Sequence, residues 1–178
     1  MRVITSSILL SLALLSGCSQ QFKHYNLDAT KESAASSFQS ATILDANKVD
    51  VVVSAVYLND VYPQYPLKNS YFLVAIYSKN PAEVLFLTGF PYDRDNVYVL
   101  KRGSDSAISA YRLDDDDPLI ELMPIHTHWA KYYYVTYPYR PGAPTLILTS
   151  KDGRTAKMTF RMPTGTVMFT QKGSVGKK

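Results

Sequence analysis

Residues 145–162, TLILTSKDGRTAKMTFRM, carry the local signal that decides the fold. Two runs with alternating apolar and polar residues flank the Asp152-Gly153 pair, and such a pair between two runs is among the strongest indications of a β-hairpin. The second run alternates between two sets, apolar Ala156, Met158, Phe160 and Met162 and polar Lys157, Thr159 and Arg161. Because side chains two positions apart on a strand share a face, we expect one face of this hairpin to meet the core and the other to meet water.

The chain before the hairpin has the same β character. Residues 49–58 and 71–77 are apolar on both faces, which is typical of strands that are covered on both sides. Shorter candidate strands follow between turn-rich segments, at residues 84–87, 97–100, 108–113, 119–123 and 131–137. About seven or eight strands of this kind predict an all-β fold, an antiparallel immunoglobulin-like or transthyretin-like β-sandwich without the disulfide of antibody domains. A small β-barrel is the alternative.

The N-terminus has a different composition. Arg2 precedes an apolar run over residues 3–15, which at about 13 residues is shorter than the roughly 20 that a membrane-spanning helix needs. The run ends in Leu15-Ser16-Gly17-Cys18, which resembles the lipobox of bacterial lipoproteins. The resemblance implies that residues 1–17 are a signal peptide and that Cys18, the single cysteine, becomes the lipidated mature N-terminus. An ordinary secretory signal with an incidental Cys18 is the alternative.

This resemblance implies where the protein is located. The mature chain would have 161 residues, with 18 basic and 15 acidic side chains and no free thiol, so its stability would come from its core rather than from a disulfide. In the sorting rule known for enteric lipoproteins, aspartate after the cysteine retains the protein in the inner membrane. This chain has Ser19 there, so we expect a palmitate-bearing outer-membrane lipoprotein with its domain in the periplasm, surface exposure being the alternative.

The pattern along the chain divides it into four parts. After the signal peptide, residues 18–47 lack a sustained apolar period and are predicted to be a flexible tether with a reach of about 30 Å, although residues 30–39 allow a short helix. Residues 48–163 are predicted to be the β-sandwich domain. Residues 164–178 form a small, basic C-terminal tail.

Two groups of residues are candidate cation ligands. Asp114, Asp115, Asp116 and Asp117 are four consecutive carboxylates, and Ca²⁺ prefers oxygen ligands; a solvated loop is the alternative. His126 and His128 lie two positions apart, so on a strand they would share a face and, with a carboxylate, hold Zn²⁺ or Cu²⁺. The alternative is that both are polar loop residues. Apart from the lipid, no cofactor is expected.

The 14 tyrosines suggest a recognition surface. Tyrosine rings are rigid and amphipathic, and they are frequent where proteins bind partners. About half of the rings are expected in the core, and the candidates for a surface that binds a protein, glycan or peptidoglycan are Tyr62, Tyr65, Tyr132, Tyr134, Tyr137 and Tyr139.

The motifs of the common enzyme classes are missing from the sequence, among them the nucleophile elbow, the paired-histidine zinc motif, the phosphate loop and the dinucleotide fingerprint. We therefore expect a protein that is not an enzyme, and nucleic acid is not an expected partner in this compartment. The first hypothesis is a membrane-anchored, non-catalytic module for protein interaction or envelope assembly. The second is a capture or sensing lipoprotein that binds a ligand or Ca²⁺, or a surface adhesin.

Overall fold

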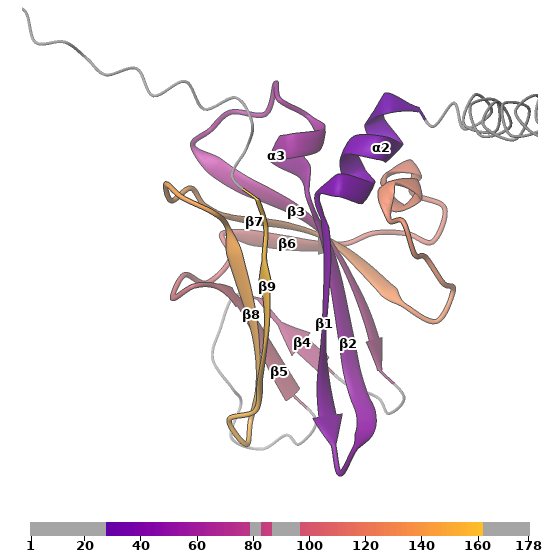
Figure 1. The fold of residues 1–178 in the computed structure, drawn as a ribbon, viewed down its shortest axis with the longest axis vertical. Coiled ribbons are helices and arrows are strands. Elements are labelled where there is room, and N and C mark those ends of the chain that lie inside the picture. The colour runs from indigo at the N-terminus through magenta and orange to yellow at the C-terminus, as the bar shows by residue number, and fades with distance from the viewer. Residues whose placement is uncertain (1–27, 79–82, 87–96, 162–178) are drawn as a thin grey trace, which may run out of the picture.

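Two β-sheets pack face to face in the computed structural model, which describes residues 28–78, 83–86 and 97–161 (Figure 1). Sheet A has the strand order β1-β2-β3-β7-β6, and sheet B has the order β4-β5-β8-β9. The strands are β1 (Phe38–Asp45), β2 (Lys48–Tyr57), β3 (Asn69–Ser78), β4 (Glu83–Leu85), β5 (Val97–Arg102), β6 (Ser109–Arg112), β7 (Lys131–Pro138), β8 (Thr145–Ser150) and β9 (Thr155–Thr159). The sheets do not close into a barrel, so the predicted β-sandwich is confirmed.

Neighbouring strands within each sheet are antiparallel, except that β4 pairs with β5 in parallel. The predicted hairpin is present as β8 and β9. Its turn contains Gly153 at φ +87°, a conformation that glycine adopts without steric cost. The side chains of β9 and the residues after it alternate as expected, with Ala156, Met158 and Phe160 buried and with Lys157, Thr159 and Arg161 exposed. Met162 lies outside the described residues.

The main core lies between the two sheets and is rich in aromatic rings. Phe72 is central, because its ring centroid lies 5.1 Å from that of Tyr57 and 5.3 Å from that of Phe160. The Tyr137 hydroxyl on β7 donates a 2.8 Å hydrogen bond to the carbonyl of Leu100 on β5. This bond joins the sheets through a buried polar group whose hydrogen-bonding need is met.

A second core covers the outer face of sheet A. Three short helices lie there, α2 (Ala29–Ser36), α3 (Leu58–Val61) and the 3₁₀-helix η2 (Pro118–Leu122). Their apolar side chains pack with Val56, Leu73 and Ala75, which point away from the main core. The inner strands β2 and β3 are therefore covered on both faces over most of their length, which explains why they are apolar at nearly every position.

The prediction of a flexible tether over residues 18–47 is wrong for the described part of that range. Residues 29–45 form α2 and β1, so the sandwich begins well before residue 48. Ala46 and Asn47, both at positive φ, make the tight turn that lets β1 pair along β2. Only Ile43 is buried in the edge strand β1, so the strand needs few apolar side chains and its apolar pattern is weak. Backbone pairing with β2 stabilises it instead.

The prediction of a strand at residues 119–123 is also wrong, because these residues belong largely to η2. The Asp117 side chain accepts a 2.8 Å hydrogen bond from the Leu119 N–H, and Pro118 occupies the first turn. Both features are typical of a helix start. Ile120 and Leu122 then reach the second core.

Candidate functional site

The structure buries two of the tyrosines that the sequence placed on a partner-binding surface. Tyr137 faces the main core and is fully buried. Tyr132 lies on the outer face of sheet A but is only 5% exposed. Its hydroxyl accepts from the Thr127 N–H at 2.8 Å and lies 3.1 Å from the Thr127 carbonyl, to which it donates. The prediction for these two is therefore wrong, since one side chain points inward and a loop covers the other.

Tyr139 lies apart from the other candidates. It follows the end of β7, and its backbone N–H donates to the Lys68 carbonyl at 3.2 Å. Its phenol is near enough to Arg102 to act on the pKa of that guanidinium, which burial lowers overall. Tyr139 is thus a half-buried residue at the Arg102 end of the sandwich.

Tyr62, Tyr65 and Tyr134, in contrast, belong to one continuous row of rings. The centroids of Tyr62 and Tyr65 are 5.4 Å apart, those of Tyr65 and Tyr71 are 4.9 Å apart, and those of Tyr71 and Tyr134 are 6.0 Å apart. These are ordinary distances for packed aromatic pairs. Tyr111 on β6 lies directly opposite Tyr134 in the β6–β7 register, on the same outer face of sheet A. We call these five residues the tyrosine stripe.

The stripe combines fixed rings with one exposed end. Its first four members are half-buried and pack against the second core, whereas the Tyr111 side chain is 62% exposed. Burial raises the pKa of both Tyr62 and Tyr134, so these phenols stay protonated near neutral pH and act as uncharged hydrogen-bonding groups. The stripe is a preformed, neutral and amphipathic surface.

Asn59 fixes the strand that supplies the middle of the stripe. Its side-chain oxygen accepts from the Tyr71 N–H at 2.8 Å, and its side-chain nitrogen donates to the Asn69 carbonyl at 3.1 Å. Tyr71 and Tyr111 are members of this surface that the sequence pattern does not predict. Nothing in the local pattern indicates them, because they join the stripe through the pairing of β3, β7 and β6.

The candidate cation ligands lie partly together. Asp115, His126 and His128 line a pocket of about 280 Å³ together with Ile120, Thr127, Ala130 and Tyr132. Within the described ranges, however, no three His, Cys, Asp or Glu side chains are close enough to hold a metal ion. Asp117 serves as the cap of η2, while Asp114 and Asp116 are exposed. The arrangement is a polar surface pocket beside a loop.

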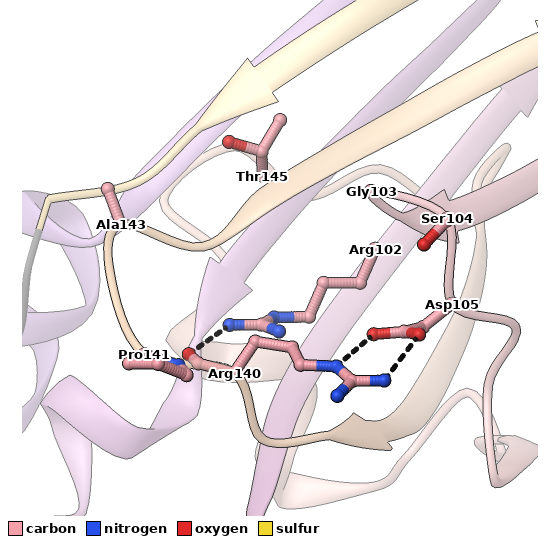
Figure 2. A pocket seen from close by; sticks show the side chains of 8 residues that line it. All are labelled: Arg102, Gly103, Ser104, Asp105, Arg140, Pro141, Ala143 and Thr145. Carbon is pink, nitrogen blue, oxygen red and sulfur yellow. Dashed lines mark hydrogen bonds and ion pairs between the residues drawn. The ribbon is translucent and has the colours of Figure 1, made fainter.

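A second pocket, of about 290 Å³, lies at the Arg102 end of β5, between the turn after this strand and the chain after β7 (Figure 2). The buried Arg102 guanidinium donates to the carbonyls of Pro138 and Arg140 at 3.3 and 2.8 Å. Arg140 in turn pairs with both oxygens of Asp105, at 2.9 and 3.0 Å, and this pairing lowers the pKa of the Asp105 carboxyl. These contacts tie the end of β5 to the chain after β7, so the geometry is that of a structural link between the sheets.

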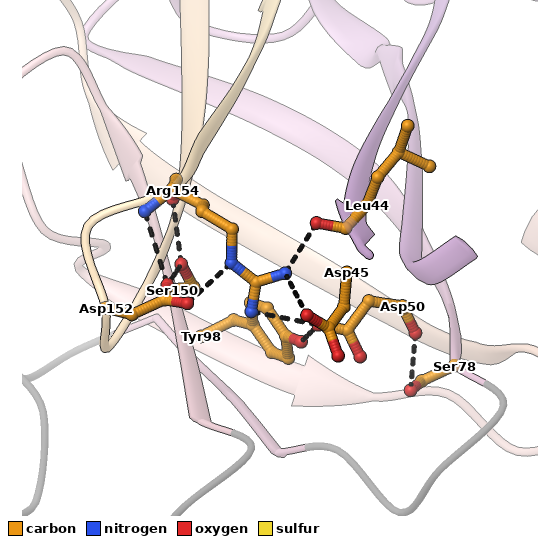
Figure 3. A network of polar contacts seen from close by, with 8 residues as sticks. All are labelled: Leu44, Asp45, Asp50, Ser78, Tyr98, Ser150, Asp152 and Arg154. Carbon is orange, nitrogen blue, oxygen red and sulfur yellow. Dashed lines mark hydrogen bonds and ion pairs between the residues drawn. The ribbon is translucent and has the colours of Figure 1, made fainter. Parts of the chain in front are cut away.

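A polar network closes the opposite seam of the sandwich, where β1 and β9 meet (Figure 3). Arg154 donates to the Leu44 carbonyl and to the Asp152 carboxylate, both at 2.6 Å, and lies 3.3 Å from Asp50. The Tyr98 hydroxyl donates to the same Asp50 carboxylate. One arginine therefore connects the β8–β9 turn with the β1–β2 hairpin.

Comparisons of the chain with known protein families, with curated proteins and with solved structures found no match. No helix in the part of the chain that the structure describes has the length and apolar character to cross a membrane. Cys18, the Leu15–Cys18 stretch that resembles a lipobox, and residues 164–178, predicted to be a basic tail, lie outside the described residues.

Proposed function

We propose that this protein is a non-catalytic interaction module of the bacterial envelope, held at the outer membrane by a lipid on Cys18. It binds another envelope protein through the tyrosine stripe. The observation that carries the binding role is the row of packed rings on the outer face of sheet A, which ends in the exposed Tyr111. The lipid anchor is supported by Leu15-Ser16-Gly17-Cys18 in the sequence.

The stripe has the properties of a protein-binding surface. Tyrosine offers large contact area with few rotatable bonds, and most of these rings are already held by the second core, so binding costs little side-chain entropy. Hot spots of protein interfaces are enriched in tyrosine and lie beside well-packed neighbours. A rigid row with one accessible ring fits this description.

An edge strand supports a protein partner rather than a small ligand. Tyr111 belongs to β6, which lies at the end of sheet A and pairs only with β7 among the described strands. The open side of an edge strand offers backbone groups to an added chain. A partner segment at β6 would therefore make backbone hydrogen bonds while it contacts the stripe.

The anchor is tested by Cys18→Ser in cells. We expect the wild-type protein to be labelled by palmitate and to sediment with the outer membrane, and we expect the variant to lose both the label and the membrane association. The lipidation would be refuted if the wild type carried no palmitate label and the Cys18→Ser variant remained in the membrane fraction.

The binding surface is tested by photo-crosslinking in cells, with a photoreactive phenylalanine analogue in place of Tyr111. The control carries the analogue in place of Lys157, which is exposed on β9 of the other sheet. We expect one discrete crosslinked band from position 111, lost on Tyr65→Ala and Tyr134→Ala, and no such band from position 157. Equal crosslinking from both positions, or none from either, would contradict the proposal.

A second candidate is the capture of a small polar ligand or a cation in the pocket that Asp115, His126 and His128 share. The observation that favours it is that the fold brings these separate sequence segments to one pocket. A ligand that binds only the folded protein raises the melting temperature. A rise on addition of Ca²⁺ or Zn²⁺ that disappears on His126→Ala would support this candidate, and an unchanged melting temperature would exclude these two ions.

A further inference from the structure

We infer that the loop at residues 123–130, between η2 and β7, lies in the lipid interface of the membrane that carries the anchor. Ile125 and Trp129 are the side chains that enter this interface. The inference rests on the proposed lipid anchor and adds to it an orientation of the domain. Its ligand is a zwitterionic lipid surface.

Ile125 and Trp129 are apolar side chains that extend into solvent. Ile125 and Trp129 are each 71% exposed, more than any other large apolar side chain among the described residues. The two lie four positions apart on one short loop. Tryptophan is enriched at membrane–water interfaces because its ring has an apolar body and an N–H that prefers a polar partner.

The loop lies on the side of the molecule where the chain from the anchor enters α2. The Lys31 ammonium pairs with the Glu121 carboxylate at 2.8 Å, which holds α2 to η2. Glu121 is also near enough to His126 for the imidazole to act on its pKa, which is lowered mainly by Lys31. The start of α2, η2 and the beginning of the loop therefore lie on one side of the molecule, over the outer face of sheet A (Figure 1).

The chain between the lipid on Cys18 and the start of α2 is short. Cys18 precedes Asp28, the first described residue, by ten positions. Ten residues span at most about 35 Å when fully extended. A lipid on Cys18 thus limits the start of α2 to within about 35 Å of the membrane surface, a distance from which the loop can reach the lipid.

The charges near the loop determine the lipid class. Asp115 lines the pocket that His126 and His128 share, and Asp114 and Asp116 beside it are exposed carboxylates. Lys131, which directly follows the loop, is exposed as well, so the charges around the loop are mixed and do not favour a strongly anionic surface. The contact is therefore apolar, through Ile125 and Trp129, and we expect it to be insensitive to salt.

Trp129 is the only tryptophan in the chain, so fluorescence reports directly on the loop. The experiment uses the full, palmitate-labelled protein in phosphatidylcholine vesicles with bromine atoms on the acyl chains. We expect the Trp129 emission to shift to shorter wavelength and to be quenched by bromine, compared with the Cys18→Ser protein in solution. We also expect the quenching to persist at high salt.

The matched control is the double variant Trp129→Phe, Leu44→Trp. Leu44 is 50% exposed and lies near the end of β1 that is remote from α2. The tryptophan that Leu44→Trp introduces should stay unquenched and unshifted. If the protein binds the vesicles but the tryptophans at positions 44 and 129 are quenched equally, the inference is overturned and the anchor stands. The same holds if the protein binds and Trp129 is not quenched. A wild type without palmitate and without vesicle binding would overturn the anchor, and the inference with it.

Discussion

Replacing Phe160 by alanine tests the core that the hairpin builds. The ring is 2% exposed, and its centroid lies 5.3 Å from that of Phe72 and 6.1 Å from that of Tyr57. Truncation of a buried phenylalanine removes its transfer free energy and leaves a cavity, which together cost about 3–5 kcal/mol. For a chain of this size we expect the melting temperature to fall by roughly 6–20 °C.

The assay is urea unfolding of residues 18–178 with Cys18→Ser, followed by far-ultraviolet circular dichroism. Arg161→Ala is the matched control, because its side chain is exposed and its loss should change the free energy of unfolding by less than about 0.5 kcal/mol. Phe160→Leu should cost less than Phe160→Ala, since it refills part of the cavity. A loss below about 1 kcal/mol for Phe160→Ala would refute the placement of this ring in the main core.

Three further predictions concern bonds, backbone and charge. Tyr137→Phe removes the hydrogen bond to the Leu100 carbonyl, so urea unfolding should show a loss of about 1–2 kcal/mol; an unchanged midpoint would mean that the bond contributes nothing. Gly153→Ala places a side chain at φ +87°, and we expect it to cost about 1–2 kcal/mol by the same assay, whereas a stabilised protein would contradict the turn geometry. Hydrogen bonding to Arg140 lowers the pKa of Asp105 below its ordinary 3.8, so the folded state holds this proton less tightly than the unfolded state. The stabilisation is complete above about pH 5 and is lost as the pH falls through the lowered pKa. Wild type and Asp105→Asn should therefore differ most in urea midpoint at neutral pH, and the difference should shrink in acid; a difference that does not change with pH would exclude the pair as the cause.

The strands that the sequence predicts best are those whose own side chains require burial. β2 and β3 are apolar on both faces because the two cores contact both faces of sheet A, and this requirement is visible in any short window of their sequence. β1 is the opposite case. Its side chains are mostly exposed or half-exposed, so its structure depends on pairing with β2 through the turn at Ala46 and Asn47. The residue pattern of β1 taken alone therefore resembles that of a polar tether.

The tyrosine stripe likewise could be predicted only in part from the sequence. Tyr132 and Tyr134 share the outer face of sheet A, yet a loop covers the first while the second joins the stripe. Period-two alternation places both on one face and cannot say which of them a distant loop will cover. Tyr71 and Tyr111 come from other strands, so the stripe exists only through the register of β3, β7 and β6. The composition indicates tyrosine as the relevant residue type, but the pairing of the strands determines which tyrosines belong to the stripe.

The outer faces of the two sheets differ in character. Both proposed surfaces, the tyrosine stripe and the loop at residues 123–130, lie on the side of sheet A. On sheet B, β9 turns the polar side chains of Thr155, Lys157 and Thr159 to solvent. Sheet A instead has an apolar outer face, which the helices cover and which the tyrosine stripe borders. Tyr132 joins the two surfaces, because its hydroxyl holds Thr127 of the loop while its strand continues to Tyr134 of the stripe. A loop fixed at the membrane would therefore set the direction in which β7 presents the stripe, so the anchor would orient the partner-binding surface as well as retain the protein.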